Sequence, residues 1–250
     1  MQWHYIGSQI GESGVKKRKE PSENHSDALG GAGTPPGDGR LALLAAGEKL
    51  FAEYGLHGAS LRQIGEAAGQ KNASAIQYHF GSRDQLVEAV FDLRMAAVNP
   101  RRQAMLDDLR RDNRQGEVRA IIAAMVWPVA EELRPRAEGN HYLRFLSRAS
   151  HETLLSITFS RPDLTSAGVE AVRMLREALR YLPEQIARTR VMLAADQVVA
   201  GLAVFESQAL GAADDFEMRV ETLIDMIAAA VAAPISTQTL QAVESQKISE

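Results

Sequence analysis

The chain has 250 residues, of which 45% are apolar and 24% charged, and its 28 basic residues against 32 acidic residues give a net charge of −4. This composition is typical of a soluble globular protein, and the length allows one large domain or two small ones. The absence of cysteine excludes disulfides, thiolate metal sites and thiol nucleophiles. The most apolar stretch, residues 226–235, is shorter than the roughly 20 residues of a membrane helix, so we expect a cytoplasmic protein without a membrane partner.

Both ends of the chain have the composition of disordered tails. Residues 1–39 are rich in Gly, Ser, Pro and charge and lack helical or strand periodicity, which is typical of disorder. Their basic cluster at residues 16–19 is balanced by acids elsewhere in the tail, so we interpret it as solvated; contact with phosphates or with an acidic partner is the alternative. Residues 234–250 are polar and begin with a proline, and we expect a frayed end there.

The region between the tails is predicted to be all-α. Apolar residues recur there at steps of three and four, and alternating runs rich in Val, Ile and Thr are missing. The first helix is expected over residues 40–54, ending at Gly55, because glycine tolerates a positive φ. Further helix breaks are predicted at Pro100, Pro128, Pro135, Pro162, Pro183 and Gly211.

Two short helices and a longer one are predicted after Gly55. S-x-x-Q capping boxes at residues 60–63 and 82–85 each mark a helix start. Gly69 ends the first short helix, and the second covers about residues 73–79, with a long helix following over 83–98. Two short helices around a glycine-containing turn, with a helix on each side, form a helix-turn-helix pattern.

This segment resembles the DNA-binding domain of the tetracycline-repressor-like (TetR) family of bacterial transcription regulators. The matching stretches, in chain order, are residues 51–55, 60–64, 68–69 and 78–83. The resemblance implies an N-terminal three-helix helix-turn-helix domain over residues 40–98, followed by a larger helical domain over residues 99–233 for ligand binding and dimerisation. It also implies a homodimeric repressor of an inverted-repeat operator that a small-molecule effector releases.

The second short helix is the predicted recognition helix. Asn and Gln side chains can make bidentate hydrogen bonds to adenine, and small side chains can contact the thymine methyl group, so the predicted base-reading residues are Asn72, Ser74, Ala75 and Gln77. Hydroxyl, imidazole and cationic groups beside helix starts suit phosphates, and the predicted phosphate contacts are Ser60, Arg62, Lys71, Tyr78, His79 and Arg83. The chain has one more residue before Tyr78 than the usual family pattern, so the helix starts at Asn72, Ala73 or Ser74.

The charge of this segment leaves a second interpretation open. Residues 40–95 contain six basic and six acidic residues, whereas DNA-binding modules usually concentrate positive charge on one face. The alternative is a helical ligand-sensing or protein-interaction module whose helix-turn-helix no longer reads DNA.

Two later stretches, residues 191–209 and 216–230, show heptad-like apolar seams. Together with the resemblance to the family, these seams predict a four-helix dimer interface about a two-fold axis. The predicted interface residues are Val191, Ala195, Val198, Leu202, Phe205, Phe216, Val220, Leu223 and Ile227. The alternative is a helical hairpin that packs entirely inside one subunit.

The region between the helix-turn-helix and these seams contains aromatic, methionine and histidine side chains of the kind that line pockets between helices. The predicted effector pocket consists of Met125, Trp127, His141, Tyr142, Phe145, His151, Phe159 and Met174. The ten-residue separation of the two histidines is not that of metal ligands on one helical face, so no metal or other cofactor is predicted. Sequence signatures of hydrolases, nucleotide-binding loops and zinc proteases are missing, and an enzyme is not expected.

Overall fold

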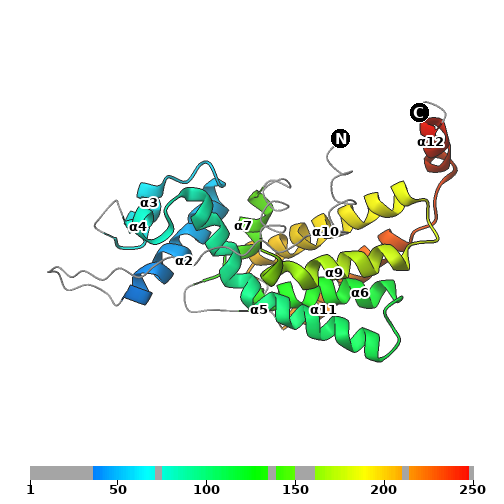
Figure 1. Cartoon of the computed structure of the whole chain (residues 1–250), viewed down its shortest axis with the longest axis horizontal. Helices are drawn as coiled ribbons and strands as arrows, with labels where there is room; N and C mark the ends of the chain where they lie inside the picture. The colour runs from blue at the N-terminus through cyan, green and yellow to red at the C-terminus, as the bar shows by residue number, and fades with distance from the viewer. Residues whose placement is uncertain (1–35, 71–74, 135–138, 150–160, 210–213, 248–250) are drawn as a thin grey trace, which may run out of the picture. The chain divides into compact units, whose positions relative to one another are not determined.

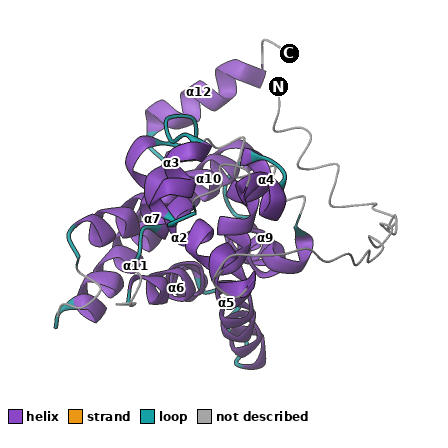
Figure 2. Cartoon of the chain, turned by 90° about the vertical axis from the view of Figure 1, so that its left-hand side faces the viewer, coloured by secondary structure: helices purple, strands orange, loops and turns teal. Residues whose placement is uncertain are grey.

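The computed structural model describes residues 36–70, 75–134, 139–149, 161–209 and 214–247, which all belong to the compact unit Thr34–Glu250. Every regular element within these residues is helical, and none of them forms a strand (Figure 2). The all-α fold expected from the sequence is therefore confirmed. The predicted tail over residues 1–39 lies outside the described residues except at its end, where the first helix begins at Pro36 rather than at residue 40. Proline suits the first turn of a helix because its missing N–H is not needed there.

Three helices make up the helix-turn-helix part: α2 (Pro36–Tyr54), α3 (Leu61–Ala67) and α4 (Ala75–Phe80) (Figure 1). Gly55 follows α2 with a φ of 78°, as expected for a residue that ends a helix in the left-handed region. The helices surround a small core whose side chains are almost fully buried, including Leu43, Phe51, Ile64 and Ile76. Each short helix thus has one face fixed by packing and the other face free.

The next helix, α5 (Arg83–Arg111), runs without interruption through Pro100. The predicted break at Pro100 is therefore wrong, and so is the one at Pro128, which lies inside α6 (Val118–Ala130). A proline removes only one backbone hydrogen bond from a helix, and buried neighbours hold the helix on both sides, as Val98 and Leu106 do in α5. Because α5 crosses residue 98, no linker separates the two predicted domains.

Most of the elements that follow pack around α6. The 3₁₀ turn η1 (Glu131–Leu133) is followed by α7 (Tyr142–Arg148), α9 (Pro162–Ala178), α10 (Glu184–Ser207) and α11 (Phe216–Ala232). Helices α5, α9 and α11 all contact α6, and α7 packs against both α2 and α10. Pro162 opens α9 and Pro183 immediately precedes α10, so these two predicted breaks are confirmed.

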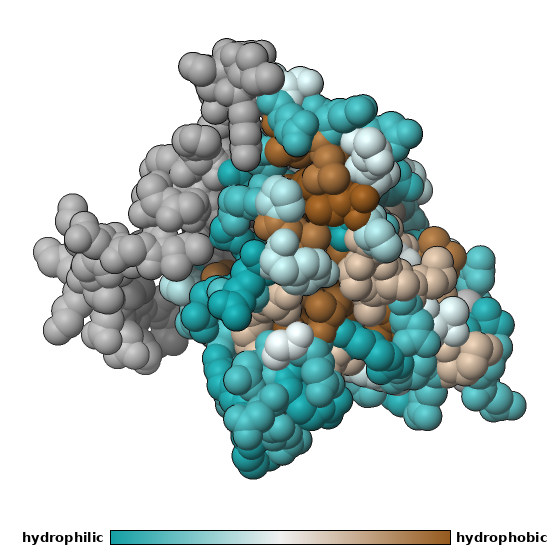
Figure 3. All heavy atoms as spheres, turned by 90° about the vertical axis from the view of Figure 1, so that its right-hand side faces the viewer, coloured by the Kyte–Doolittle hydropathy of each residue, from teal (hydrophilic) through white to brown (hydrophobic). Residues whose placement is uncertain are grey.

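A further helix, α12 (Thr237–Lys247), is present where the sequence suggested a frayed end. Val243 packs partly against the core, whereas Leu240 is 40% exposed. On the side of the molecule where α12 lies, hydrophobic residues gather between hydrophilic ones (Figure 3), so this face keeps apolar surface that the described residues do not cover.

Among the described residues, no single helix is long and apolar enough to span a membrane, although α11 and residues 237–245 pass that test together as a bent pair.

Candidate nucleic-acid interface

The start of α3 is fixed by a complete capping box. The Ser60 hydroxyl accepts a hydrogen bond from the Gln63 backbone N–H at 3.1 Å, and the Gln63 side chain accepts one from the Ser60 N–H at 2.9 Å. At α5 the Ser82 hydroxyl accepts from the Gln85 N–H at 3.2 Å, but the reciprocal bond is not formed. The first predicted capping box is confirmed, and the second is present only as an N-cap.

Helix α4, the predicted recognition helix, is anchored by its apolar face and exposes its polar face. Ile76 and Phe80 are 2% and 7% exposed, whereas Gln77 is exposed and Tyr78 is 85% exposed. The ring of His79 lies edge-on to that of Tyr78, with 5.0 Å between the ring centroids. On the other side, the Arg40 guanidinium of α2 lies 5.0 Å from the Phe80 ring centroid. A large aromatic side chain kept in solvent beside an exposed amide is suited to contact with a ligand surface.

Three predicted contacts, Lys71, Asn72 and Ser74, lie outside the described residues. Ala75 is the first described residue of α4, and the three expected start positions of this helix, residues 72–74, also lie outside the described residues.

The two arginines predicted to contact phosphate differ in what they bind. Arg62 is exposed and pairs with Glu66 one turn later, at 2.9 Å. The Arg83 guanidinium instead donates to the backbone carbonyls of Leu56 and Ala59, at 2.7 and 2.5 Å. Arg83 thus stabilises the turn between α2 and α3, and only Arg62 keeps its charge at the surface. The sequence contained no local signal of this role because the bonded residues are 27 and 24 positions away.

A buried ion-pair cluster joins α2 to the helices that follow. Arg94 of α5 donates to both carboxylate oxygens of Glu48, at 2.9 and 3.0 Å. The backbone N–H of His141 donates to the same carboxylate at 3.0 Å, and Glu132, which is fully buried, lies 3.7 Å from Arg94 and 3.1 Å from Arg101. Sequence analysis missed this cluster, since ion pairs between distant positions leave no periodic pattern.

The predicted pocket residues that the structure describes are mostly core residues. Tyr142 and Phe145 are fully buried and stack on each other, with ring centroids 6.1 Å apart; Met125 and Met174 are each 7% exposed. Trp127 is half-buried and donates from Nε1 to Glu221 at 2.8 Å. His151 and Phe159 lie outside the described residues.

The His141 ring, which was predicted to line the effector pocket, contacts Arg144 of α7. Its Nδ1 lies 2.5 Å from Nη2 of Arg144, and since arginine only donates, Nδ1 is the acceptor in this contact. Burial and the Arg144 charge hold the pKa of His141 below its ordinary value, which favours the neutral form of the ring.

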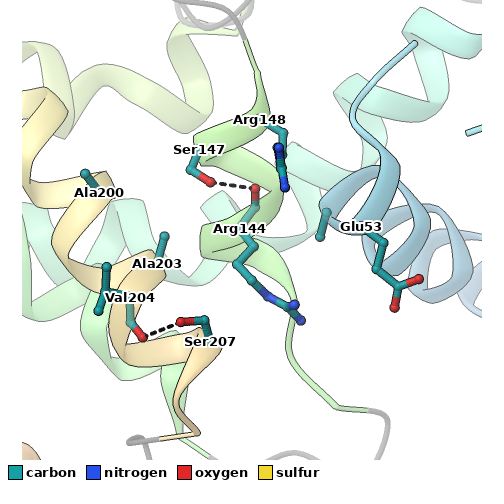
Figure 4. A pocket seen from close by; sticks show the side chains of 9 residues that line it. Glu53, Arg144, Ser147, Arg148, Ala200, Ala203, Val204 and Ser207 are labelled. Carbon is teal, nitrogen blue, oxygen red and sulfur yellow. Dashed lines mark hydrogen bonds between the residues drawn. The ribbon is translucent and has the colours of Figure 1, made fainter. Parts of the chain in front are cut away.

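An open groove of about 580 Å³ lies between α2, α7 and α10, and none of the predicted pocket residues lines it. Arg144 and Arg148 extend into it from α7, opposite Ala200, Ala203 and Val204 of α10 (Figure 4). Elsewhere in the described part of the chain, no group of three His, Asp or Glu side chains is placed to hold a metal ion.

The predicted dimer seam is packed inside the chain. Leu202 and Val220 are fully buried and Val191, Val198, Phe216 and Ile227 are at most 5% exposed, while Ala195, Phe205 and Leu223 are partly buried against the same core. The seam residues therefore join α10 and α11 to their own domain, as in the hairpin alternative. The outward faces of the two helices carry other apolar residues, among them Leu193, Val204, Met218 and Met226, which are 48%, 51%, 57% and 66% exposed.

Comparison with known proteins finds relatives of the helix-turn-helix segment. The family described as "Bacterial regulatory proteins, tetR family" matches residues 43–90. The HTH-type transcriptional repressor AcnR of Corynebacterium glutamicum is 39% identical over 59 residues, which are 24% of this chain and 31% of AcnR. AcnR of Corynebacterium efficiens is 38% identical over 58 residues, 23% of this chain and 30% of that protein. The match thus spans about a third of the length of these relatives.

Among solved structures, a mutant of the protein HlyIIR has the same fold, with a TM-score of 0.50 and 17% identity over 80% of this chain and 99% of HlyIIR. The sequence match at residues 43–90 and the likeness to the HlyIIR fold are both consistent with an all-helical chain that contains a helix-turn-helix. The segment at residues 43–90 is therefore similar to the tetR family of bacterial regulatory proteins and to the matching part of the AcnR repressors.

Proposed function

We propose that the chain is a transcriptional repressor that reads an operator in double-stranded DNA by placing α4 in the major groove. The observation that carries this proposal is the exposure of Gln77 and Tyr78 on a helix whose opposite side is anchored by Ile76 and Phe80. A rigid helix with a free polar face presents its side chains to base edges without an ordering cost. The AcnR relatives, which are repressors by name, match over this same segment.

The contacts divide by chemistry. Gln77 is the base reader in this proposal, since its amide both donates and accepts, as adenine requires. Ser60, Arg62, Tyr78 and His79 contact phosphates, because hydroxyl, guanidinium and imidazole groups bind phosphate oxygens without reading sequence. Lys71, Asn72, Ser74 and Ala75 complete the proposed interface. Arg83 supports it through the turn between α2 and α3.

The repressor is a homodimer in this proposal, since one short helix reads only a few base pairs and two helices held apart read an inverted repeat. The outward faces of α10 and α11 support this arrangement. Large apolar side chains exposed on a helix pair mark an interaction surface, and Leu193, Val204, Met218 and Met226 are each exposed on these two helices, which pack against each other. Residues 99–233 form the effector-binding and dimerisation domain.

Operator binding is tested by selecting duplexes from a random library with the full-length protein and measuring their affinity across a salt series. Gln77→Ala is expected to relax the base preference at one position of each half-site, whereas Tyr78→Phe weakens all sequences to a similar extent. Gln185→Ala and Tyr181→Phe, at exposed positions of α10 and of the preceding turn, serve as matched controls. Failure to enrich any sequence would contradict the proposal and favour the sensing or interaction module.

A further inference from the structure

The groove between α2, α7 and α10 lies at the junction of the helix-turn-helix part with the helices that follow it (Figure 4). Its volume of about 580 Å³ falls within the roughly 300–1,000 Å³ of small-molecule sites. The apolar part of its lining consists of Ala52, Ala200, Ala203 and Val204. Side chains this small leave the space between the three helices open to a ligand.

The guanidinium of Arg144 is fixed in its orientation by two partners. Its Nε donates to Glu206 at 3.2 Å, and its Nη2 donates to His141 Nδ1 at 2.5 Å. Glu206 is fixed in turn, since its side chain is 4% exposed and accepts the backbone N–H groups of Leu143 and Arg144, each at 2.9 Å. Nη1 of Arg144 makes no hydrogen bond to any residue that the structure describes. A guanidinium held in one orientation thus keeps free N–H donors at the groove.

Arg148 lies one turn further along α7 and extends into the same groove (Figure 4). Within the described ranges of the chain, its guanidinium has no carboxylate partner. Like charges four residues apart on a helix destabilise it, and Arg144 and Arg148 have this spacing. The two guanidiniums therefore attract an anionic group, which neutralises the excess positive charge.

The α2 wall of the groove carries a negative charge. Glu53 is exposed, lines the groove and makes no ion pair with any other residue whose position is described. Glu53 and Arg148 are thus opposite charges at one groove that do not pair with each other. The hydroxyls of Ser147 and Ser207 donate to backbone carbonyls of their own helices, each at 2.8 Å, so neither offers its proton to a ligand. Recognition of a ligand therefore depends on the charged groups.

We propose that this groove binds an α-amino acid with an aliphatic side chain. The ligand carboxylate accepts from Arg148 and from the free N–H groups of Arg144, since carboxylate and guanidinium match in geometry and charge. The ligand ammonium group donates to Glu53. The aliphatic side chain packs against Ala200, Ala203 and Val204 of α10. A zwitterion satisfies both unpaired charges of the groove at once, which neither a simple acid nor a simple amine does.

The inference rests on the proposed function only in taking the amino acid as the effector. The ligand links Glu53 of α2, the first helix of the helix-turn-helix part, to Arg148 of α7. Helices α2 and α7 also pack on each other directly, so the bound ligand favours one spacing of this pair over others. Because α2 packs against α3 as well, the same preference shifts the population of conformations of the helix-turn-helix.

The binding test uses the full-length protein with L-leucine as the probe. Isocaproate and isoamylamine are the matched analogues, which lack the ammonium group and the carboxylate, respectively. Titration calorimetry at constant ionic strength and the melting temperature are read without DNA. Leucine is expected to bind at millimolar concentration and to raise the melting temperature. Each analogue should bind about five- to tenfold more weakly, as for the loss of one partly exposed charged contact.

Two charge-removing variants test the two ends of the ligand separately. Arg148→Gln should weaken leucine binding about five- to tenfold and leave isoamylamine binding unchanged, whereas Glu53→Gln should weaken leucine equally and leave isocaproate unchanged. Both side chains lack partners among the described residues, so the ligand-free melting temperatures should match that of the wild type. Arg180→Gln and Glu244→Gln, at exposed positions outside the groove, are the matched controls and should bind leucine like the wild type.

The inference fails if leucine does not bind, if either analogue binds as tightly as leucine, or if Arg148→Gln or Glu53→Gln binds leucine like the wild type. Operator affinity, measured separately with and without leucine, distinguishes this inference from the repressor. Operator binding without leucine binding overturns only the inference, and leucine binding without operator binding overturns only the repressor. An operator affinity that bound leucine leaves unchanged overturns its role as the effector.

Discussion

Glu48 of α2 and Arg94 of α5 form a buried two-pronged ion pair, with side chains 4% and 10% exposed. Both nitrogen–oxygen distances are close to 3 Å, so the planar guanidinium and the carboxylate face each other in register. The pair is the polar link between the first helix of the helix-turn-helix part and the helix that leaves it.

Removing one member of this pair should destabilise the protein strongly. Glu48→Leu or Arg94→Met leaves an uncompensated buried charge, and each is expected to lower the free energy of unfolding by about 3–5 kcal/mol. The double variant should be more stable than either single variant, because neither charge remains. Urea unfolding monitored by circular dichroism measures all three. Additive losses in the double variant would show that the two side chains act independently.

The capping box of α3 should contribute measurably to stability. Ser60→Ala removes the acceptor for the Gln63 N–H and is expected to lower the free energy of unfolding by about 1 kcal/mol. Ser60→Thr keeps a hydroxyl at the same position and should recover most of the loss. Thermal unfolding of the two variants is the measurement, and an equal loss for both would mean that the hydroxyl is unimportant.

Arg62 and Arg83 should behave differently although both were predicted to contact phosphate. Arg62→Gln removes an exposed charge. The slope of the logarithm of DNA affinity against the logarithm of salt concentration should therefore fall in magnitude by about one, while the free energy of unfolding is nearly unchanged. Arg83→Gln removes the bonds to Leu56 and Ala59, so it should lower stability by about 1–3 kcal/mol. If Arg83→Gln changes the salt slope at full stability, Arg83 is a phosphate contact after all.

Dimerisation should depend on the outward faces of α10 and α11. Val204→Glu and Met226→Glu place a charge on these faces, so each is expected to shift the protein from dimer to monomer in light scattering after gel filtration. Val169→Glu, at a position of α9 that is 37% exposed, is the control and should remain dimeric. A wild-type protein that is monomeric at high concentration would contradict the homodimer.

Much of the helix-turn-helix could be predicted from the sequence because its signals are local. The Ser60–Gln63 box and Gly55 fix helix ends through atoms only a few residues apart. The course of α5 through Pro100 was not predictable in this way, since neighbouring helices hold it together. The seam on α10 and α11 shows a further limit: periodicity identified the apolar face, but only the packed structure shows that the face is turned toward α6 and α7.

The residues of the candidate site also divide into those that local sequence patterns predict and those that depend on distant contacts. The exposure of Gln77 and Tyr78 follows from the four-residue spacing of Ile76 and Phe80 along one short helix. The bond from Arg83 to Leu56 and the pairing of Glu48 with Arg94 depend on residues far apart in the chain. A single sequence carries no periodic trace of such contacts.

The unbroken course of α5 has a mechanical consequence. Its 29 residues at about 1.5 Å each make a rod roughly 44 Å long. The buried Leu106 lies in the distal half of this rod, and Ser82, beside α4, stands at its near end. A tilt of about 1° about one end of such a rod moves the other by roughly 0.8 Å, so a tilt of about 4° matches the ~3.4 Å rise of one base pair. A movement in the distal half that is small enough to preserve core packing is therefore large enough to put α4 out of step with the bases it faces.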